Sequence, residues 1–145
     1  MVKIYYDDDA DLGILKDRKI AIVGYGSQGH AQAQNLKDSG CDVIVAEKEG
    51  GPIWDIAEKD GFDVMNASDA SKEAGYIQIL LPDELHPIIY KNDILSNLEK
   101  GDVLAFSHGF NIHYGQIVPP DFVDVVMIAP KSPGHLVRRM YQDGG

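Results

Sequence analysis

A glycine-rich segment at residues 24–29 constrains the fold of this chain more than any other feature. It follows the apolar run 20–23, precedes a segment with helical spacing and consists of Gly24-Tyr25-Gly26-Ser27-Gln28-Gly29. This order is typical of a buried strand, a tight turn and a helix whose first amides can bind a pyrophosphate. The pattern is weak evidence when it stands alone, because glycines also form purely structural turns.

A second apolar run, 43–46, follows at the distance expected for a β-α-β unit and ends at Glu47. In such a unit Gly24 permits the turn, Gly26 lets a cofactor approach the backbone, and Gly29 lets helix and strand pack closely. An acidic residue at the end of the second strand accepts hydrogen bonds from the adenosine ribose. The sequence context therefore predicts a dinucleotide-binding domain.

The remaining pattern extends this unit into a doubly wound fold. Strands are predicted over 20–23, 42–46, 62–65, 76–81, 103–106 and 123–128. Helices are predicted after Gly29 and over 53–60 and 68–74, and one or two short helices over 88–98. Ser68 is the predicted N-cap of the third helix. We therefore expect one α/β domain over 1–145, a Rossmann-like, mainly parallel sheet with helices on both faces. Residues 1–18 form a lead-in that packs Ile14 and Leu15 on this domain.

Composition excludes several classes of partner. The formal charge of -10 and the pI near 4.7 argue against nucleic acid and anionic membranes, which repel an acidic protein. Cys41 is the only cysteine, so no internal disulfide can form and a cytoplasmic location is favoured. The N-terminus has no signal-peptide hydrophobic region, and no apolar run approaches the ~20 residues of a membrane span.

The loop after the second strand bears on the choice of cofactor. Glu47 can accept hydrogen bonds from both ribose hydroxyls and would repel the 2′-phosphate of NADP. Lys48 favours NADPH instead, because its ammonium could pair with that phosphate. Since Glu47 and Glu49 flank Lys48 and the loop contains no Ser, Thr or Arg, NADH is favoured and NADPH stays open.

Two loops at the carboxyl edge of the predicted sheet carry candidate catalytic residues. His108 follows the strand at 103–106, and Lys131 follows the strand at 123–128. An imidazole and an ammonium beside a nicotinamide could polarise a carbonyl and move its proton. Asp83 and Glu84 follow the strand at 76–81, where helix capping explains them better than an acid-base pair. No metal site is predicted within this chain.

Together these segments resemble one known family over nearly the whole chain. The matching motifs are Tyr5-Tyr6-Asp7, Gly24-Tyr25-Gly26-Ser27-Gln28-Gly29-His30-Ala31, Leu81-Pro82-Asp83-Glu84, Ser107-His108-Gly109-Phe110-Asn111-Ile112 and Ala129-Pro130-Lys131-Ser132-Pro133-Gly134. The chain is similar to the N-terminal domain of the ketol-acid reductoisomerases, also called acetohydroxy acid isomeroreductases.

The resemblance implies roles for particular residues. His108 would be the active-site histidine, and Lys131 and Gly134 would lie near substrate and nicotinamide. The implied cofactor contacts are Tyr25, Gly26, Ser27 and Gln28 at the pyrophosphate, and Asp83, Glu84, Leu85 and His86 along the cofactor. NADPH-using members generally have an Arg and serines where this sequence has Lys48, Gly51 and Ile53, which strengthens the prediction of NADH.

The resemblance also implies a reaction. In this family Mg²⁺ promotes an alkyl shift in 2-acetolactate or 2-aceto-2-hydroxybutyrate, and NAD(P)H then reduces the product to a 2,3-dihydroxy acid of isoleucine and valine biosynthesis. A helical domain supplies the Mg²⁺ carboxylates and lies beyond Gly145, and the complete enzyme is expected to be a homo-oligomer. We therefore expect this chain alone to bind cofactor without completing the reaction.

Two other functions stay open at this point. The chain could be a stand-alone module that senses nicotinamide dinucleotides, which the missing metal carboxylates favour and His108 and Lys131 disfavour. It could also belong to a hydroxy-acid or imine reductase that borrows its second half from another subunit.

Overall fold

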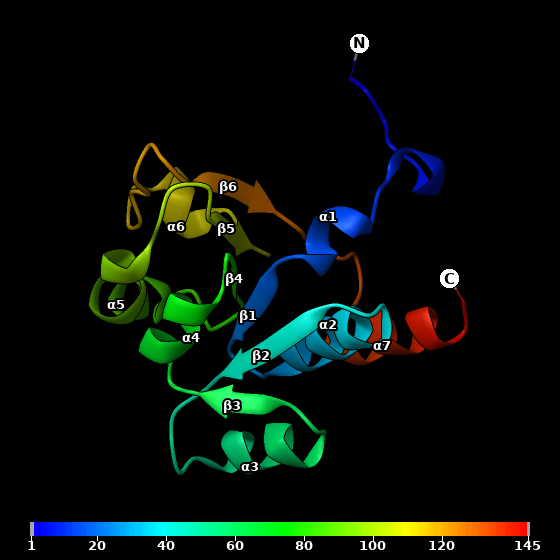
Figure 1. Ribbon diagram of the computed structural model, residues 1–145, viewed down its shortest axis with the longest axis horizontal. Helices are drawn as coiled ribbons and strands as arrows, with labels where there is room; N and C mark the ends of the chain where they lie inside the picture. The colour runs from blue at the N-terminus through cyan, green and yellow to red at the C-terminus, as the bar shows by residue number, and fades with distance from the viewer. Residues whose placement is uncertain (1, 145) are drawn as a thin grey trace.

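The computed structural model describes residues 2–144, and a parallel sheet forms their centre (Figure 1). Its six strands run in the order β3-β2-β1-β4-β5-β6. They are β1 (Lys19–Val23), β2 (Asp42–Ala46), β3 (Asp63–Met65), β4 (Tyr76–Ile79), β5 (Val103–Phe106) and β6 (Asp124–Met127). Every neighbouring pair is parallel, with Ile22 opposite both Val45 and Gln78. The predicted Rossmann-like, doubly wound fold is confirmed.

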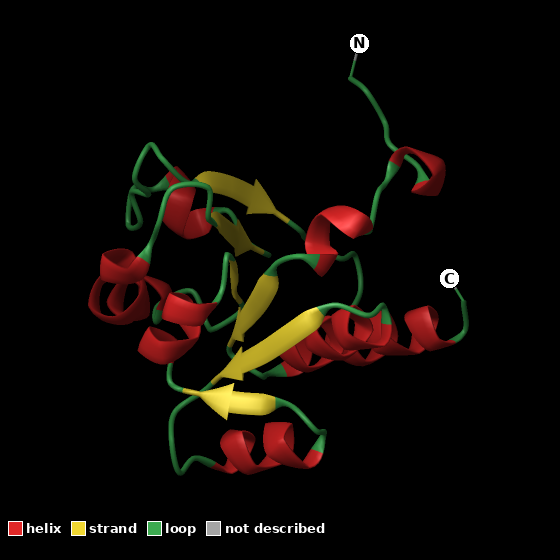
Figure 2. Cartoon of the chain, viewed as in Figure 1, coloured by secondary structure: helices red, strands yellow, loops and turns green. Residues whose placement is uncertain are grey.

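Helices cover both faces of the sheet (Figure 2). They are α1 (Gly13–Lys16), α2 (Ser27–Asp38), α3 (Pro52–Lys59), α4 (Ala67–Glu73), α5 (His86–Ile89), α6 (Phe110–His113) and α7 (Gly134–Gln142). The short turns are η1 (Asp7–Asp9), η2 (Tyr90–Ile94, a π-helical turn) and η3 (Leu95–Asn97). Helices α2 and α3 contribute to one buried cluster, α4 and η2 contribute to the other, and α7 packs along α2.

The central strand explains why the sheet needs cover on both faces. Ile20 and Ile22 of β1 enter one hydrophobic cluster, whereas Ala21 and Val23 enter the other. All four residues are at most 2% exposed. A strand buried on both faces has a continuous apolar sequence, which is why the run at 20–23 predicts it well.

Several element boundaries differ from the prediction. The third helix begins at Ala67, because Asn66 is its N-cap and accepts a hydrogen bond from the Asp69 N–H; Ser68 lies inside the helix. The one or two short helices predicted over 88–98 are three short elements, α5, η2 and η3, and the first of them begins at His86. In the lead-in, Leu15 packs against the core as expected, whereas Ile14 is 68% exposed because the short α1 turns it to solvent.

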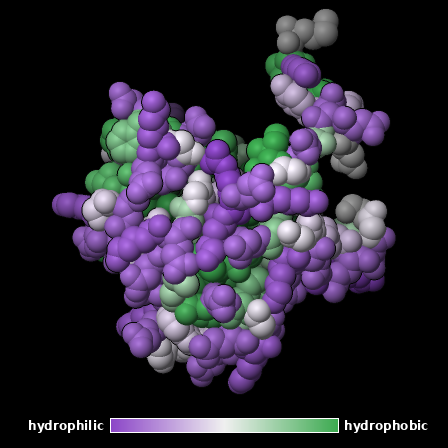
Figure 3. Space-filling model, in the orientation of Figure 1, coloured by the Kyte–Doolittle hydropathy of each residue, from purple (hydrophilic) through white to green (hydrophobic). Residues whose placement is uncertain are grey.

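The surface agrees with the charge of the sequence. Hydrophilic side chains cover most of the face shown in Figure 3, and a smaller hydrophobic area interrupts them near its centre. Cys41 is a free, buried thiol, and burial raises its pKa. Between residues 2 and 144 the structure contains no helix with the length and hydropathy that crossing a membrane requires.

Candidate cofactor-binding site

The glycine turn between β1 and α2 has the geometry of an anion site. Gly24 has a φ of 97°, a conformation that favours glycine. A Cβ at Gly29 would overlap the carbonyl oxygen of Gly24, so the helix can approach the turn only without a side chain. A Cβ at Gly26 would meet nothing within 4 Å. Open space therefore lies beside Gly26 at the N-terminus of a 12-residue helix, where a pyrophosphate fits.

The buried side chain of Tyr25 anchors this glycine turn. Its side chain is 3% exposed, and its hydroxyl donates a hydrogen bond to Asp60 Oδ2 over 2.8 Å. Its ring meets Phe62 edge to face, with 5.6 Å between the centroids. Burial raises the pKa of the phenol. The side chain therefore anchors the turn on the segment after α3.

Glu47 links the end of β2 to the same turn. Its carboxylate accepts a hydrogen bond from the backbone N–H of Tyr25 through Oε1, and Oε2 lies 3.3 Å from the Lys48 nitrogen. The side chain thus lies beside the glycine turn, and its role as a ribose-binding carboxylate stays a prediction.

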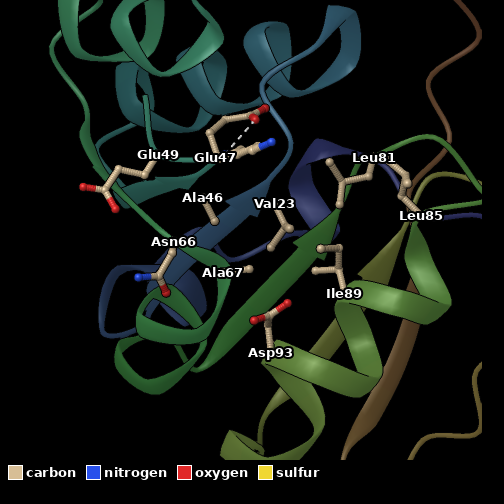
Figure 4. Close-up of a pocket in the computed structure, with 11 residues that line it drawn as sticks. Val23, Ala46, Glu47, Glu49, Asn66, Ala67, Leu81, Leu85, Ile89 and Asp93 are labelled. Carbon is tan, nitrogen blue, oxygen red and sulfur yellow. Dashed lines mark hydrogen bonds between the residues drawn. The ribbon is translucent and has the colours of Figure 1, made fainter. Parts of the chain in front are cut away.

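A pocket of about 400 Å³ opens next to Glu47 (Figure 4). Val23 and Ala46 form its floor, and Leu81, Leu85 and Ile89 line the wall opposite Glu47 and Glu49. Lys48, Asn66, Ala67 and Asp93 complete the lining. An apolar slot with a few polar groups at its rim suits a flat heteroaromatic ring joined to a ribose. Gly51 and Ile53 lie beyond it, at the N-cap and in the first turn of α3.

The loops after β4 and β5 meet at a second hollow, of about 380 Å³, lined by Asp83, Glu84, Pro87, Phe110, Asn111 and Gln116. Asp83 Oδ2 lies 2.7 Å from His108 Nδ1. The buried Asn111 donates through Nδ2 to the Asp83 carbonyl over 2.9 Å. His108 stacks on Phe110, and its side chain remains 65% exposed. A carboxylate on Nδ1 orients the ring, which leaves Nε2 for an exchangeable proton.

His86, which is predicted to lie along the cofactor, has a buried side chain. Its imidazole is 2% exposed and has Nε2 2.6 Å from the Leu81 carbonyl oxygen. The ring also lies against Phe106, with 6.0 Å between centroids. Because this side chain is buried, it supports the loop after β4, whereas its neighbour Leu85 reaches the first pocket.

The start of α7 lies against the start of α2. Gly134 is buried there, and a Cβ on it would overlap the Ser27 carbonyl oxygen. Gln28 donates through Nε2 to the Ser132 carbonyl over 2.9 Å. Lys131 is exposed, and no hydrogen bond or ion pair within residues 2–144 joins it to His108. The structure therefore pairs His108 with Asp83 and not with Lys131.

The described residues do not fit a Mg²⁺ site. Among the side chains that the structure describes there is no group of three or more His, Cys, Asp or Glu that could hold a metal ion. Asp83 is paired with His108 and does not join other carboxylates in such a group.

Sequence reasoning missed three buried polar residues near these loops. In the sequence Asn111 stands out only as part of a matching motif, although this residue ties α6 to Asp83. Gln32 and Gln78 are 8% and 2% exposed and hydrogen-bond to each other. The signal for Gln78 was available, because an amide interrupts an otherwise apolar strand.

Taken together, the parallel sheet, the glycine turn and the pocket at the end of β2 define a nicotinamide-dinucleotide-binding domain. Residues 14–145 match the family described as "Acetohydroxy acid isomeroreductase, NADPH-binding domain". Because that match covers nearly the whole sequence, the chain belongs to this family.

Similar proteins agree with this assignment. The chain is 60% identical over 144 residues to the ketol-acid reductoisomerase (NADP(+)) of Petrotoga mobilis, and 54% identical to that of Methanopyrus kandleri. Each alignment covers 99% of this chain and 44% of the relative, so the chain spans less than half of their length. The solved NADH-preferring ketol-acid reductoisomerase from an uncultured archean matches with a TM-score of 0.94 at 48% identity, over 99% of this chain and 45% of that one.

The fold extends to more distant proteins. A 3-hydroxyisobutyrate dehydrogenase of Mycobacterium tuberculosis matches with a TM-score of 0.68 at 17% identity, over 84% of this chain and 43% of that one. At this identity the likeness shows the shared fold alone.

Proposed function

We propose that this chain binds NAD(P)H across the carboxyl ends of β1, β2 and β4 and is the cofactor-binding part of a ketol-acid reductoisomerase. The observation that carries the proposal is the open space at Gly26, between the N-terminus of α2 and the pocket at Glu47. The adenosine would occupy that pocket, and the pyrophosphate would lie against the amides of Ser27 and Gln28. The nicotinamide would then extend toward the loops of Asp83 and His108.

The chemistry follows from this placement. The cofactor supplies a hydride when it is bound. His108, oriented by Asp83 through Nδ1, holds a proton at Nε2 beside the ring, where a substrate oxygen becomes negative as a carbonyl is reduced. Lys131 would add positive charge near the same oxygen. No step through Mg²⁺ is derived from this chain, because its described residues form no such site.

NADH is the proposed preference. The pocket rim carries Glu47 and Glu49 against the single ammonium of Lys48, and the adjoining Gly51 and Ile53 provide neither a hydroxyl nor a guanidinium. A 2′-phosphate would lie beside two carboxylates, which disfavours NADPH.

Titration of cofactor fluorescence tests this preference. NADH should bind about tenfold more tightly than NADPH, a difference of about 1.4 kcal/mol. Glu47→Gln should reduce this difference in affinity, because it weakens NADH binding and removes a carboxylate that repels NADPH. Glu99→Gln, outside both pockets, is the charge-matched control. Equal affinities for the two cofactors in the unmodified chain would refute the preference.

The activity of the whole enzyme is the second part of the proposal. The chain should be joined to the remaining part of the Petrotoga mobilis relative and assayed with Mg²⁺, 2-acetolactate and NADH. Turnover would support a ketol-acid reductoisomerase, and His108→Ala should lower it by about 10²-fold or more with little change in NADH affinity. Tight NADH binding without turnover would favour a dinucleotide sensor. Turnover of simple 2-keto acids without Mg²⁺ would favour another reductase class.

Location and assembly complete the proposal. A chain with one buried thiol and no disulfide suits the reducing cytoplasm. Homo-oligomers are proposed for the complete enzyme, and light scattering of the joined protein measures their size.

A further inference from the structure

A chain of side-chain amides crosses one face of the sheet. Gln78 lies in the middle of β4, between Ile22 of β1 and Ala105 of β5, and is 2% exposed. Its Nε2 donates to Oε1 of Gln32 on α2. A buried amide is costly without a partner, and an apolar side chain would suit the neighbouring Ile22 and Ala105 better. The Gln78–Gln32 pair is therefore a specific feature of this core.

The hydrogen bonds continue from Gln32 in one direction. Gln32 donates through Nε2 to Gln28 Oε1 over 3.0 Å and lies 3.3 Å from Ser107 Oγ. Gln28 donates in turn to the Ser132 carbonyl over 2.9 Å. Gln32 and Gln28 each accept at the amide oxygen and donate from the nitrogen, so the successive bonds that begin at Gln78 polarise one another in the same sense.

The ends of this chain lie next to the two candidate catalytic residues. Ser107 immediately precedes His108, and its hydroxyl also donates to the Ile128 carbonyl over 2.6 Å. Ser132 immediately follows Lys131. Gln28 belongs to the first turn of α2, which forms the candidate pyrophosphate site. The amide chain thus joins the sheet, the glycine turn and both loops.

We propose that Gln78 and Gln32 are positioning residues that fix the loops of His108 and Lys131 relative to the glycine turn. They touch neither cofactor nor substrate; they act through Gln28, Ser107 and Ser132. This inference rests on the proposed function. Fixing the two loops relative to the glycine turn would place the nicotinamide ring against them.

The test uses Gln78→Met and Gln32→Met, which keep side-chain length and remove the amide. Ile77→Val is the matched control, because Ile77 is the adjacent residue of β4, is fully buried and belongs to the opposite cluster. Hydrogen exchange is followed in the segments 107–113 and 129–135. Affinity is measured for NADH and for ADP-ribose, which lacks the nicotinamide.

Both glutamine variants should exchange about tenfold faster in the two segments, with Ile77→Val unchanged there. They should also weaken the binding of NADH more than that of ADP-ribose, since positioning concerns the nicotinamide end. The ratio of the two dissociation constants should change by about threefold or more. The inference is overturned if the glutamine variants exchange at the rate of Ile77→Val. It is also overturned if they exchange faster but leave the ratio of NADH to ADP-ribose affinity unchanged. If the unmodified chain binds neither ligand, the proposed function fails, and the exchange result alone then decides the structural link.

Discussion

The central and outer strands of the sheet differ sharply although their sequences are similar. β1 is buried on both faces and carries the glycine turn, whereas β6 is an edge strand that precedes Lys131 (Figure 1). All four residues of β6 are exposed, with Val126 at 38% and Met127 at 63%. The candidate cofactor turn is therefore built by the core itself, while the loop of Lys131 depends on a few long-range contacts.

This difference divides the molecule into a buried cofactor half, centred on β1 and α2, and an open half, formed by β6 and the loops that follow β5 and β6. Substitutions in the buried cofactor half should change stability or binding strongly, because backbone atoms lie against the glycines. Exposed side chains of the open half should tolerate change. The predictions below test this contrast.

The largest effect is expected for Gly29→Ala. The new Cβ would overlap the Gly24 carbonyl oxygen, and displacing α2 from the turn should cost about 3 kcal/mol or more. Gly26→Ala is the matched control, because its Cβ has open space and should change stability by less than about 1 kcal/mol. Urea unfolding measures both variants.

The same pair separates stability from binding. Gly26→Ala should stay folded and lose NADH affinity, because its methyl group would occupy the proposed position of the pyrophosphate. Full affinity in folded Gly26→Ala would show that the cofactor does not approach this turn.

Gly134→Ala is expected to have the next largest effect. Its Cβ would overlap the Ser27 carbonyl oxygen, so α7 must move away from α2 at a cost of about 2 kcal/mol. Arg138 and Arg139 should then become faster sites of tryptic cleavage. His135→Ala, at an exposed neighbouring residue, should be cleaved at the unmodified rate; equal rates in both variants would mean that α7 does not depend on this contact.

Tyr25→Phe should cost about 1 kcal/mol at pH 7, because the bond to Asp60 is lost. Burial raises the pKa of this phenol in the folded protein. Its contribution is therefore complete below the unfolded pKa of about 10 and is lost as pH rises toward the folded value. Chemical unfolding between pH 8 and 11 should show a steeper loss of stability for the unmodified chain. Parallel curves would contradict this assignment, since Tyr76 and Tyr90 titrate in both proteins.

His108→Ala should change stability least, by less than about 0.5 kcal/mol, because an exposed pair with Asp83 contributes little. Asn111→Ala provides the contrast within the same hollow. It removes a buried donor to the Asp83 carbonyl and should cost about 1–3 kcal/mol. Thermal unfolding measures both, and similar losses would show that His108 also holds the loop.

The sequence predicted best those features that depend on local pattern. The glycines, the apolar strands and the position of Glu47 follow from spacing within one β-α-β unit, and the structure places them as expected. The exact start of the third helix does not follow from the local pattern. Asn66 and Ser68 are both good N-cap residues, and the backbone conformation selects Asn66.

Features that join distant segments could not be predicted. The pairing of Asp83 with His108 requires two loops to meet, and the burial of His86 depends on Phe106 beneath it. The sequence also contained no sign that β6 is exposed, because Val125, Val126 and Met127 would suit a buried strand equally well. Such outcomes depend on which elements cover a strand, which its own residues do not encode.

The contact of α7 with α2 has a consequence for biosynthesis. Gln28 and Ser132 are 104 positions apart, so the ribosome makes the glycine turn long before it makes the segment that packs against it. A nascent chain can pair β1 with β2 early, yet the surroundings of the turn remain incomplete until α7 leaves the exit tunnel. The contact that fixes the glycine turn against the segment before α7 is thus completed late in translation.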